Sequence, residues 1–156
     1  KGAKQVLEVL SRLSNADYNV KLLAVGGNIF SNDKLEKLII SPGWLSSEDM
    51  RIVYEISHIT LVPSIYPDPF PTIVLESMQS GTPVVATCFG GAKEAVVDGK
   101  TGFVVNPFNV DYFYNRVKEI LDNDELSSDM GKESKKRFNN LFTIDNCIKQ
   151  YTKFVY

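Results

Sequence analysis

The sequence predicts an α/β fold in which a parallel β-sheet is covered by helices on both faces. Short apolar runs alternate with segments whose apolar residues recur every three or four positions, as in amphipathic helices. Glycine- or proline-rich breaks follow most of the apolar runs. Strands that alternate with helices and are apolar throughout are typical of a parallel sheet buried on both sides.

Each element is predicted from its apolar pattern and from the residues that begin or end it. Val6, Leu10 and Leu13 form the stripe of the first helix, and Ser47 can cap a later one. The expected helices are 3–14, 47–57, 72–80, 90–97, 109–122, 124–139 and 143–155, of which the last three form a helical C-terminal tail. The expected strands are 20–25, 38–41, 59–62, 83–87 and 103–105.

Length, charge and composition narrow the class of protein. The 156 residues fit one domain, 1–156, and the opening Lys-Gly indicates a segment of a longer chain. The net charge is -2, whereas nucleic-acid-binding domains are usually strongly basic, so no nucleic-acid partner is expected. No apolar run approaches the roughly 20 residues that span a bilayer. His58 is the single histidine and the two cysteines form no cluster, so we expect no metal site and a cytoplasmic setting.

The loops that follow the strands are the places to search for a ligand site. In parallel α/β folds, ligands bind at the carboxyl ends of the strands. Gly26-Gly27 follows the first expected strand, and its missing side chains would let a ligand approach the backbone. A simple strand-end turn is the alternative interpretation.

The loop 63–71 and the helix after it carry two acids around a possible anion site. Pro71 suits the first helical position, which leaves the N–H groups of Thr72 and Ile73 at the positive end of the helix dipole. Glu76 lies about 6 Å further along the helix axis, and Asp68 lies in the loop before it. This arrangement suits a nucleotide diphosphate flanked by hydroxyl-bearing sugars. The alternative makes Asp68 a turn former and Glu76 a solvated helix residue.

Several ordered motifs then resemble one family. Asp68 and Glu76 are separated by seven residues, and the run Glu76-Ser-Met-Gln-Ser-Gly-Thr-Pro-Val-Val-Ala follows. Gly90-Gly91, Glu94 and the segment 98–105 continue the pattern. This stretch resembles the donor-binding signature of retaining GT-B glycosyltransferases of family 4, the group 1 glycosyltransferases. The resemblance implies the Rossmann-like C-terminal half of a GT-B fold, without the N-terminal domain that binds the acceptor.

The resemblance also implies roles for individual residues. Glu76 would bind the donor's ribose hydroxyls, and Asp68 would contact the transferred sugar. The pyrophosphate and the base of the donor would be held by Lys1, Gly26, Gly27, Trp44, Leu45, Phe70, Pro71, Thr72 and Ile73. The family usually has Glu at position 68 and often Gly at position 71, so the sugar and the phosphate contacts would differ from the usual ones.

The implied activity is hexose transfer from a nucleoside diphosphate sugar, with retention and without a metal or other cofactor. This segment alone would be inactive, because the acceptor domain is expected to supply catalytic groups. A sugar-nucleotide epimerase and a receiver-type signalling domain are the two alternatives. A basic group on the 124–139 helix, Lys132, Lys135, Lys136 and Arg137, could touch anionic lipid, although a solvated surface also explains it.

Overall fold

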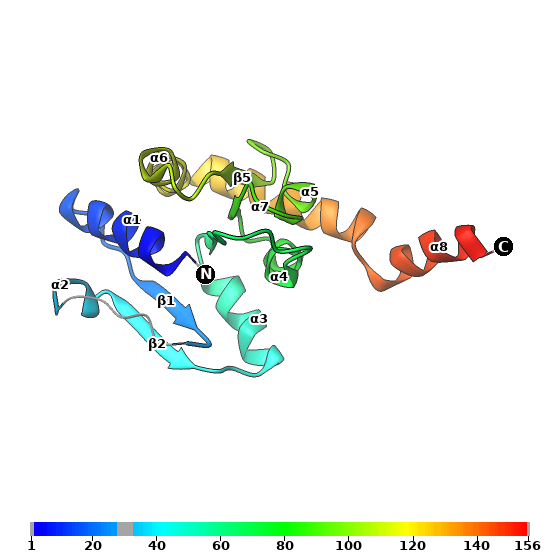
Figure 1. Ribbon diagram of the computed structural model, residues 1–156, viewed down its shortest axis with the longest axis horizontal. Coiled ribbons are helices and arrows are strands. Elements are labelled where there is room, and N and C mark those ends of the chain that lie inside the picture. Colours follow the sequence, from blue (N-terminus) through cyan, green and yellow to red (C-terminus); the bar gives the residue numbers. More distant parts are fainter. Residues whose placement is uncertain (1, 28–32, 156) are drawn as a thin grey trace.

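A computed structural model describes residues 2–27 and 33–155 (Figure 1). The helices are α1 (Ala3–Asn15), α2 (Asp33–Glu36), α3 (Ser47–Ile56), α4 (Thr72–Ser80), α5 (Ala92–Ala95), α6 (Val110–Leu121), α7 (Asp124–Leu141) and α8 (Ile144–Val155). The strands are β1 (Leu22–Val25), β2 (Ile39–Gly43), β3 (Thr60–Val62), β4 (Val84–Thr87) and β5 (Gly102–Val105). Every predicted element is present within a few residues, and the one-turn helix α2 is an addition.

All strand pairs of the described residues are parallel, as the sequence predicts, but they form two sheets. β1 pairs with β2, and the second sheet has the order β3-β4-β5. In the second sheet Thr60 lies opposite Val84, which in turn lies opposite Gly102. A single hydrogen-bonded sheet is therefore not formed by these residues, although the α/β class with helices around parallel strands is confirmed.

Strand β4 lies at the centre of the core, with a cluster of apolar side chains on each of its faces. Val85 belongs to one cluster, whereas Val84 and Ala86 belong to the other, because successive side chains of a strand point to opposite faces. All three are 0% exposed. The sheet around β4 is thus covered on both sides.

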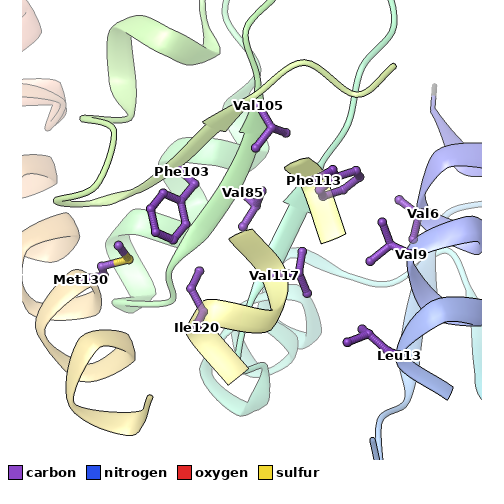
Figure 2. Close-up of a cluster of buried hydrophobic side chains, with 10 residues drawn as sticks. All are labelled: Val6, Val9, Leu13, Val85, Phe103, Val105, Phe113, Val117, Ile120 and Met130. Atoms are coloured by element: carbon purple, nitrogen blue, oxygen red, sulfur yellow. The ribbon is translucent and has the colours of Figure 1, made fainter. Parts of the chain in front are cut away.

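The first cluster joins α1 to the second sheet. Figure 2 shows side chains of α1 beside those of α6 and of strands β4 and β5, with Met130 of α7 at the far end. Its buried members are Val6, Val9, Leu13, Val85, Phe103, Val105, Phe113, Val117, Ile120 and Met130. Leu22 of β1 and Leu61 of β3 pack against the same cluster. Apolar packing therefore holds the two sheets in one core.

The second cluster fixes helix α4, which carries the candidate site. It contains Val62, Val74, Met78, Val84, Ala86, Ala92, Ala95 and Val96. Helix α7 also approaches the C-terminal end of α4 closely: a Cβ atom on Gly131 would lie 2.2 Å from the carbonyl oxygen of Gly81, the C-cap residue of α4. Val74 and Met78 are 0% exposed. The opposite face of α4 is left at the surface.

Helix α8 extends away from the sheets at the end of the longest axis (Figure 1). Three apolar side chains on it are exposed: Ile144 by 78%, Ile148 by 55% and Tyr151 by 75%. They follow the i, i+4, i+7 spacing of one helix face. The last helix therefore carries an apolar stripe that no other part of the described chain covers.

Candidate functional site

The loop 63–71 after β3 is held by the glycine pair that follows β4. The amide of Gly91 donates a hydrogen bond to the carbonyl oxygen of Asp68 at 2.8 Å. A Cβ atom on Gly90 would lie 2.1 Å from that oxygen, and one on Gly91 would lie 1.9 Å from the carbonyl oxygen of Pro69. Only glycine allows so close an approach. Two loops from neighbouring strands therefore form one surface.

Helix α4 begins at this surface with an open N-terminus. Pro71 is the N-cap residue, with φ -71° and ψ 113°, and not the first helical residue that the sequence predicts. A ψ value in the extended range places Pro71 just outside the helix, and its ring offers no acceptor to the N–H groups. Thr72 and Ile73 are both exposed. Their N–H groups lie at the positive end of the helix dipole.

The two predicted acids lie on either side of that helix start. Asp68 is half-buried in the loop, and Glu76 is exposed on the second turn of α4. Within residues 2–27 and 33–155, the Asp68 carboxylate has no hydrogen-bond or ion-pair partner. Glu76 does have one, because its Oε2 atom accepts a hydrogen bond of 2.8 Å from the hydroxyl of Tyr54.

Tyr54 is a site residue that sequence reasoning missed. It comes from α3 and is 4% exposed. Burial, and then its hydrogen bond to the Glu76 carboxylate, raise the pKa of Tyr54 well above the usual range for a phenol. Its partner is 22 residues away in the sequence. No local pattern predicts such a contact.

A buried polar network holds α3 and α4 together beneath this contact. The Thr82 hydroxyl donates to the carbonyl oxygen of Tyr54 at 2.6 Å. The Ser77 hydroxyl lies 3.0 Å from the Thr82 carbonyl oxygen and 2.8 Å from the Thr60 hydroxyl. Since a hydroxyl has one proton, Ser77 donates to the carbonyl and accepts from Thr60. The network joins α3, α4 and β3.

Gly26, Gly27, Trp44 and Leu45 form a second group at the ends of β1 and β2. The Gly26 amide donates to the carbonyl oxygen of Gly43 at 2.8 Å. Gly26 has φ +94°, and a Cβ there would lie 3.6 Å from the Trp44 ring. Trp44 is 88% exposed, whereas Leu45 is half-buried. Helix α3 begins just after this group and leads toward Glu76.

Two further predicted residues complete the set. Phe70 is 39% exposed, and its ring lies tilted against that of Phe142 with 6.0 Å between centroids. Lys1, expected on the pyrophosphate, lies outside the described residues. The structure thus brings Asp68, Phe70, Pro71 and the start of α4 together. Among the described residues, no hydrogen bond or ring contact joins them to the Gly26–Trp44 group.

Asp122-Asn123-Asp124 has a spacing that suits a metal, although the sequence analysis expects no metal site. Asp122 accepts from Lys118 at 2.5 Å and from the Tyr18 hydroxyl, and these contacts, that of Lys118 first, lower its pKa. The Asn123 side chain caps α7. Within the described part of the chain, no group of three potential ligands could hold a metal ion. The segment ends α6 and begins α7.

The basic group on α7 is divided in the structure. Lys132 and Lys136 are exposed and pair with Asp129 and Glu133 on the same helix. Arg137 instead donates to the carbonyl oxygens of Ala95 and Glu94 at 2.8 and 2.9 Å, so it anchors α5. Of the four basic residues, Arg137 is therefore held within the fold. No helix in residues 2–27 and 33–155 has the length and apolarity needed to cross a membrane.

Residues 1–137 match the family described as "Glycosyl transferases group 1". The chain belongs to this family. The D-inositol 3-phosphate glycosyltransferase of Corynebacterium diphtheriae is 37% identical over 84 residues, which cover 54% of this chain and 19% of that protein. The receiver-type alternative is thereby set aside.

Solved structures show the same fold. Sucrose-phosphate synthase from Thermosynechococcus elongatus matches with a TM-score of 0.87 and 24% identity, over 99% of this chain and 41% of that one. Anabaena HepE in complex with UDP-glucose matches with a TM-score of 0.81 and 20% identity, over 95% and 44%. A C-terminal domain of a group 1 family protein from Francisella tularensis matches with 0.78 and 20%, over 92% and 80%.

These matches define which part of the fold the chain represents. It spans about two fifths of the two longer structures, and most of a chain that is itself a C-terminal domain. The chain therefore has the fold of the C-terminal half of a GT-B glycosyltransferase, as the resemblance implies. A sequence relative and a shared fold do not by themselves give the substrate.

Proposed function

We propose that this chain binds the nucleoside diphosphate sugar donor of a retaining hexosyltransferase. The observation that carries the proposal is the open N-terminus of α4 between the two acids, Asp68 and Glu76. A helix N-terminus stabilises phosphate through its free N–H groups and its dipole. Carboxylates bind hydroxyls well, because each oxygen can accept from a separate O–H.

Each part of the donor has a corresponding group of residues. The pyrophosphate would lie on the N–H groups of Thr72 and Ile73, with Lys1 as its counter-charge. Glu76 would accept from the ribose, and Asp68 from the transferred hexose. Trp44, exposed beside Gly26, offers a flat apolar face to the base. The complex of Anabaena HepE with UDP-glucose, which shares this fold, supports a donor of this chemical class.

The chemical task is to let a nucleoside diphosphate leave an oxocarbenium-like sugar. Stabilising the charge that develops on the leaving pyrophosphate supplies much of the rate enhancement available to a protein. The helix N–H groups perform this task without a metal ion in our proposal. Retention of configuration is inferred from the resemblance to family 4 enzymes. We therefore expect EDTA to leave transfer unchanged.

Transfer also requires an acceptor site, which we assign to a second, N-terminal domain. The chain spans 41% and 44% of two solved structures of the same fold, which supports a partner domain in the full-length protein. We propose that residues 1–156 alone bind donor weakly and transfer nothing. Peripheral membrane contact of the full-length protein, with a lipid-linked or glycan acceptor, is part of the same proposal.

The test is a donor screen on the full-length chain that contains these residues, followed by mutation. UDP-, GDP- and ADP-hexoses are compared by calorimetry, and transfer is then measured with the donor that binds. Glu76→Ala and Asp68→Ala should each lower kcat/KM by about 10- to 100-fold, the loss of one or two charged hydrogen bonds. Glu125→Ala, which removes an exposed helical glutamate outside the site, is the matched control. Unchanged transfer in both site variants would refute the proposal.

A further inference from the structure

The Glu76 carboxylate is exposed, yet one of its oxygens is already engaged. Oε2 accepts the 2.8 Å hydrogen bond from Tyr54, whose side chain is buried against α4. A glutamate on an exposed helix face ordinarily samples several rotamers, and fixing it on binding costs entropy. The phenol therefore restricts the carboxylate before any ligand arrives.

Tyr54 is held at its backbone as well as at its hydroxyl. Its backbone carbonyl accepts from Thr82, and Thr82 is joined through Ser77 to β3. Thr82 is 4% and Ser77 0% exposed, so the network is screened from water. A displaced α3 would break the contacts of both the Tyr54 carbonyl and its hydroxyl. The position of the Glu76 carboxylate thus depends, through Tyr54, on the packing of the core.

The remaining acceptor sites of Glu76 match a vicinal diol. An ionised carboxylate has two oxygens with about four acceptor positions. Tyr54 uses one position on Oε2, which leaves Oε1 and the second position on Oε2 for two hydroxyls. The carboxylate plane must be oriented correctly for both hydroxyls to be bound at once.

We propose that Tyr54 is a positioning residue that orients Glu76 and so gives the site its preference for ribose over 2′-deoxyribose. The proposal rests on the proposed function, because it takes Glu76 as the ribose contact. A donor that carries both the 2′- and the 3′-hydroxyl of ribose can form both hydrogen bonds to the oriented carboxylate. A 2′-deoxy nucleotide offers one hydroxyl and gains less from the orientation.

The experiment measures Kd by calorimetry for three matched pairs, UDP with dUDP, GDP with dGDP and ADP with dADP, on the full-length chain. The wild type should bind one ribonucleotide about tenfold more tightly than its deoxy partner, the ratio that one charge-assisted hydrogen bond supplies. Tyr54→Phe removes only the hydroxyl. It should reduce this ratio to about two- or threefold, chiefly by weakening the ribonucleotide.

The chain contains a matched control. The Tyr18 hydroxyl also donates to a carboxylate, that of Asp122, at the junction of α1 and α6. Tyr18→Phe should leave the ribose preference unchanged. In a Glu76→Ala background, Tyr54→Phe should cause no further change in Kd, since it acts through Glu76.

The outcomes separate this inference from the proposed function. If the wild type binds none of the nucleotides, the proposed function and this inference both fail. If nucleotides bind and Glu76→Ala weakens them, but Tyr54→Phe keeps the wild-type ratio, the donor site stands and the positioning role is refuted. A Tyr54→Phe effect that persists in the Glu76→Ala background also refutes it, because the phenol would then act by another route.

Discussion

The carbonyl oxygen of Asp68 accepts a hydrogen bond from the amide of Gly91 at 2.8 Å, which joins the loop after β3 to the turn after β4. Both partners are backbone groups, so the contact depends on the absence of a side chain at position 91. The acid proposed to meet the sugar is therefore placed by a glycine 23 residues further along the chain.

Gly91→Ala should displace this loop and impair the site. The added Cβ would lie 1.9 Å from the Pro69 carbonyl oxygen, and a backbone atom cannot simply rotate away. We expect the full-length chain to lose about tenfold or more in kcat/KM and about 1–3 kcal/mol of stability. Gly99→Ala is the control for kcat/KM, because a Cβ there meets no atom within 4 Å and the cost of its positive φ of +72° falls on the turn before β5. Equal effects of the two variants on kcat/KM would contradict the prediction.

Ser77→Ala should destabilise the fold by about 1–3 kcal/mol, because it leaves two buried polar groups without their partner. These groups are the Thr60 hydroxyl and the Thr82 carbonyl. Urea denaturation measures the change. Adding Thr60→Val should recover part of the loss, since removing both hydroxyls costs less than orphaning one. If the double variant loses more free energy of unfolding than the two single variants lose together, this account is contradicted.

Because the pKa of Tyr54 is raised, the stability of the fold should change with pH in the alkaline range. In the unfolded chain a tyrosine loses its proton near about pH 10, whereas burial and Glu76 keep Tyr54 protonated in the folded state. The contribution of Tyr54 is therefore fully present below about pH 10 and is lost as pH rises toward the folded pKa.

The measurement compares the free energy of unfolding of the wild type and Tyr54→Phe at several pH values. Below about pH 10 the variant should be less stable by about 1–2 kcal/mol. Above about pH 10 the difference in free energy of unfolding between the two proteins should narrow by about 1.4 kcal/mol per pH unit. The other tyrosines are common to both proteins and cancel. A gap that stays constant to pH 11 would rule out a raised pKa.

Two neighbouring cations on α7 should differ widely in their importance. Arg137→Met removes the two hydrogen bonds to the last turn of α5 and should cost about 1.5–3 kcal/mol. Lys136→Met removes an exposed ion pair of 3.9 Å and should cost less than about 0.5 kcal/mol. Thermal unfolding of the two variants gives the comparison. Similar losses would mean that Arg137 does not anchor α5.

The sequence predicts the elements well because their signals are local. Apolar spacing and breaks place every long helix and every strand, and the loop that holds Asp68 is found from its position after a strand. Helix α2 was missed because one turn is too short to show a periodic pattern. Pro71 was placed one residue too far inside α4, since a proline suits both the first helical position and the position before it.

The site is predicted less completely, because its contacts join distant segments. The Gly90-Gly91 pair carries no sign in the sequence that it approaches the backbone of Asp68 and Pro69. Tyr54 resembles any apolar-face residue of an amphipathic helix until the fold brings it to Glu76. The pairing of the strands is likewise a long-range property, and the predicted single sheet is divided among the described residues.

Two sheets instead of one leave four edge strands in the described chain: β2, β1, β3 and β5. Strands β1 (Leu22–Val25) and β3 (Thr60–Val62) each have one unpaired edge, and both strands are short and largely apolar. Unpaired strand edges can pair with another polypeptide, but Leu22 of β1 and Leu61 of β3 pack against the same buried cluster, so both strands face one core. Among the described residues, the seam between the two sheets is therefore held by side-chain packing, with no ladder of backbone hydrogen bonds across it.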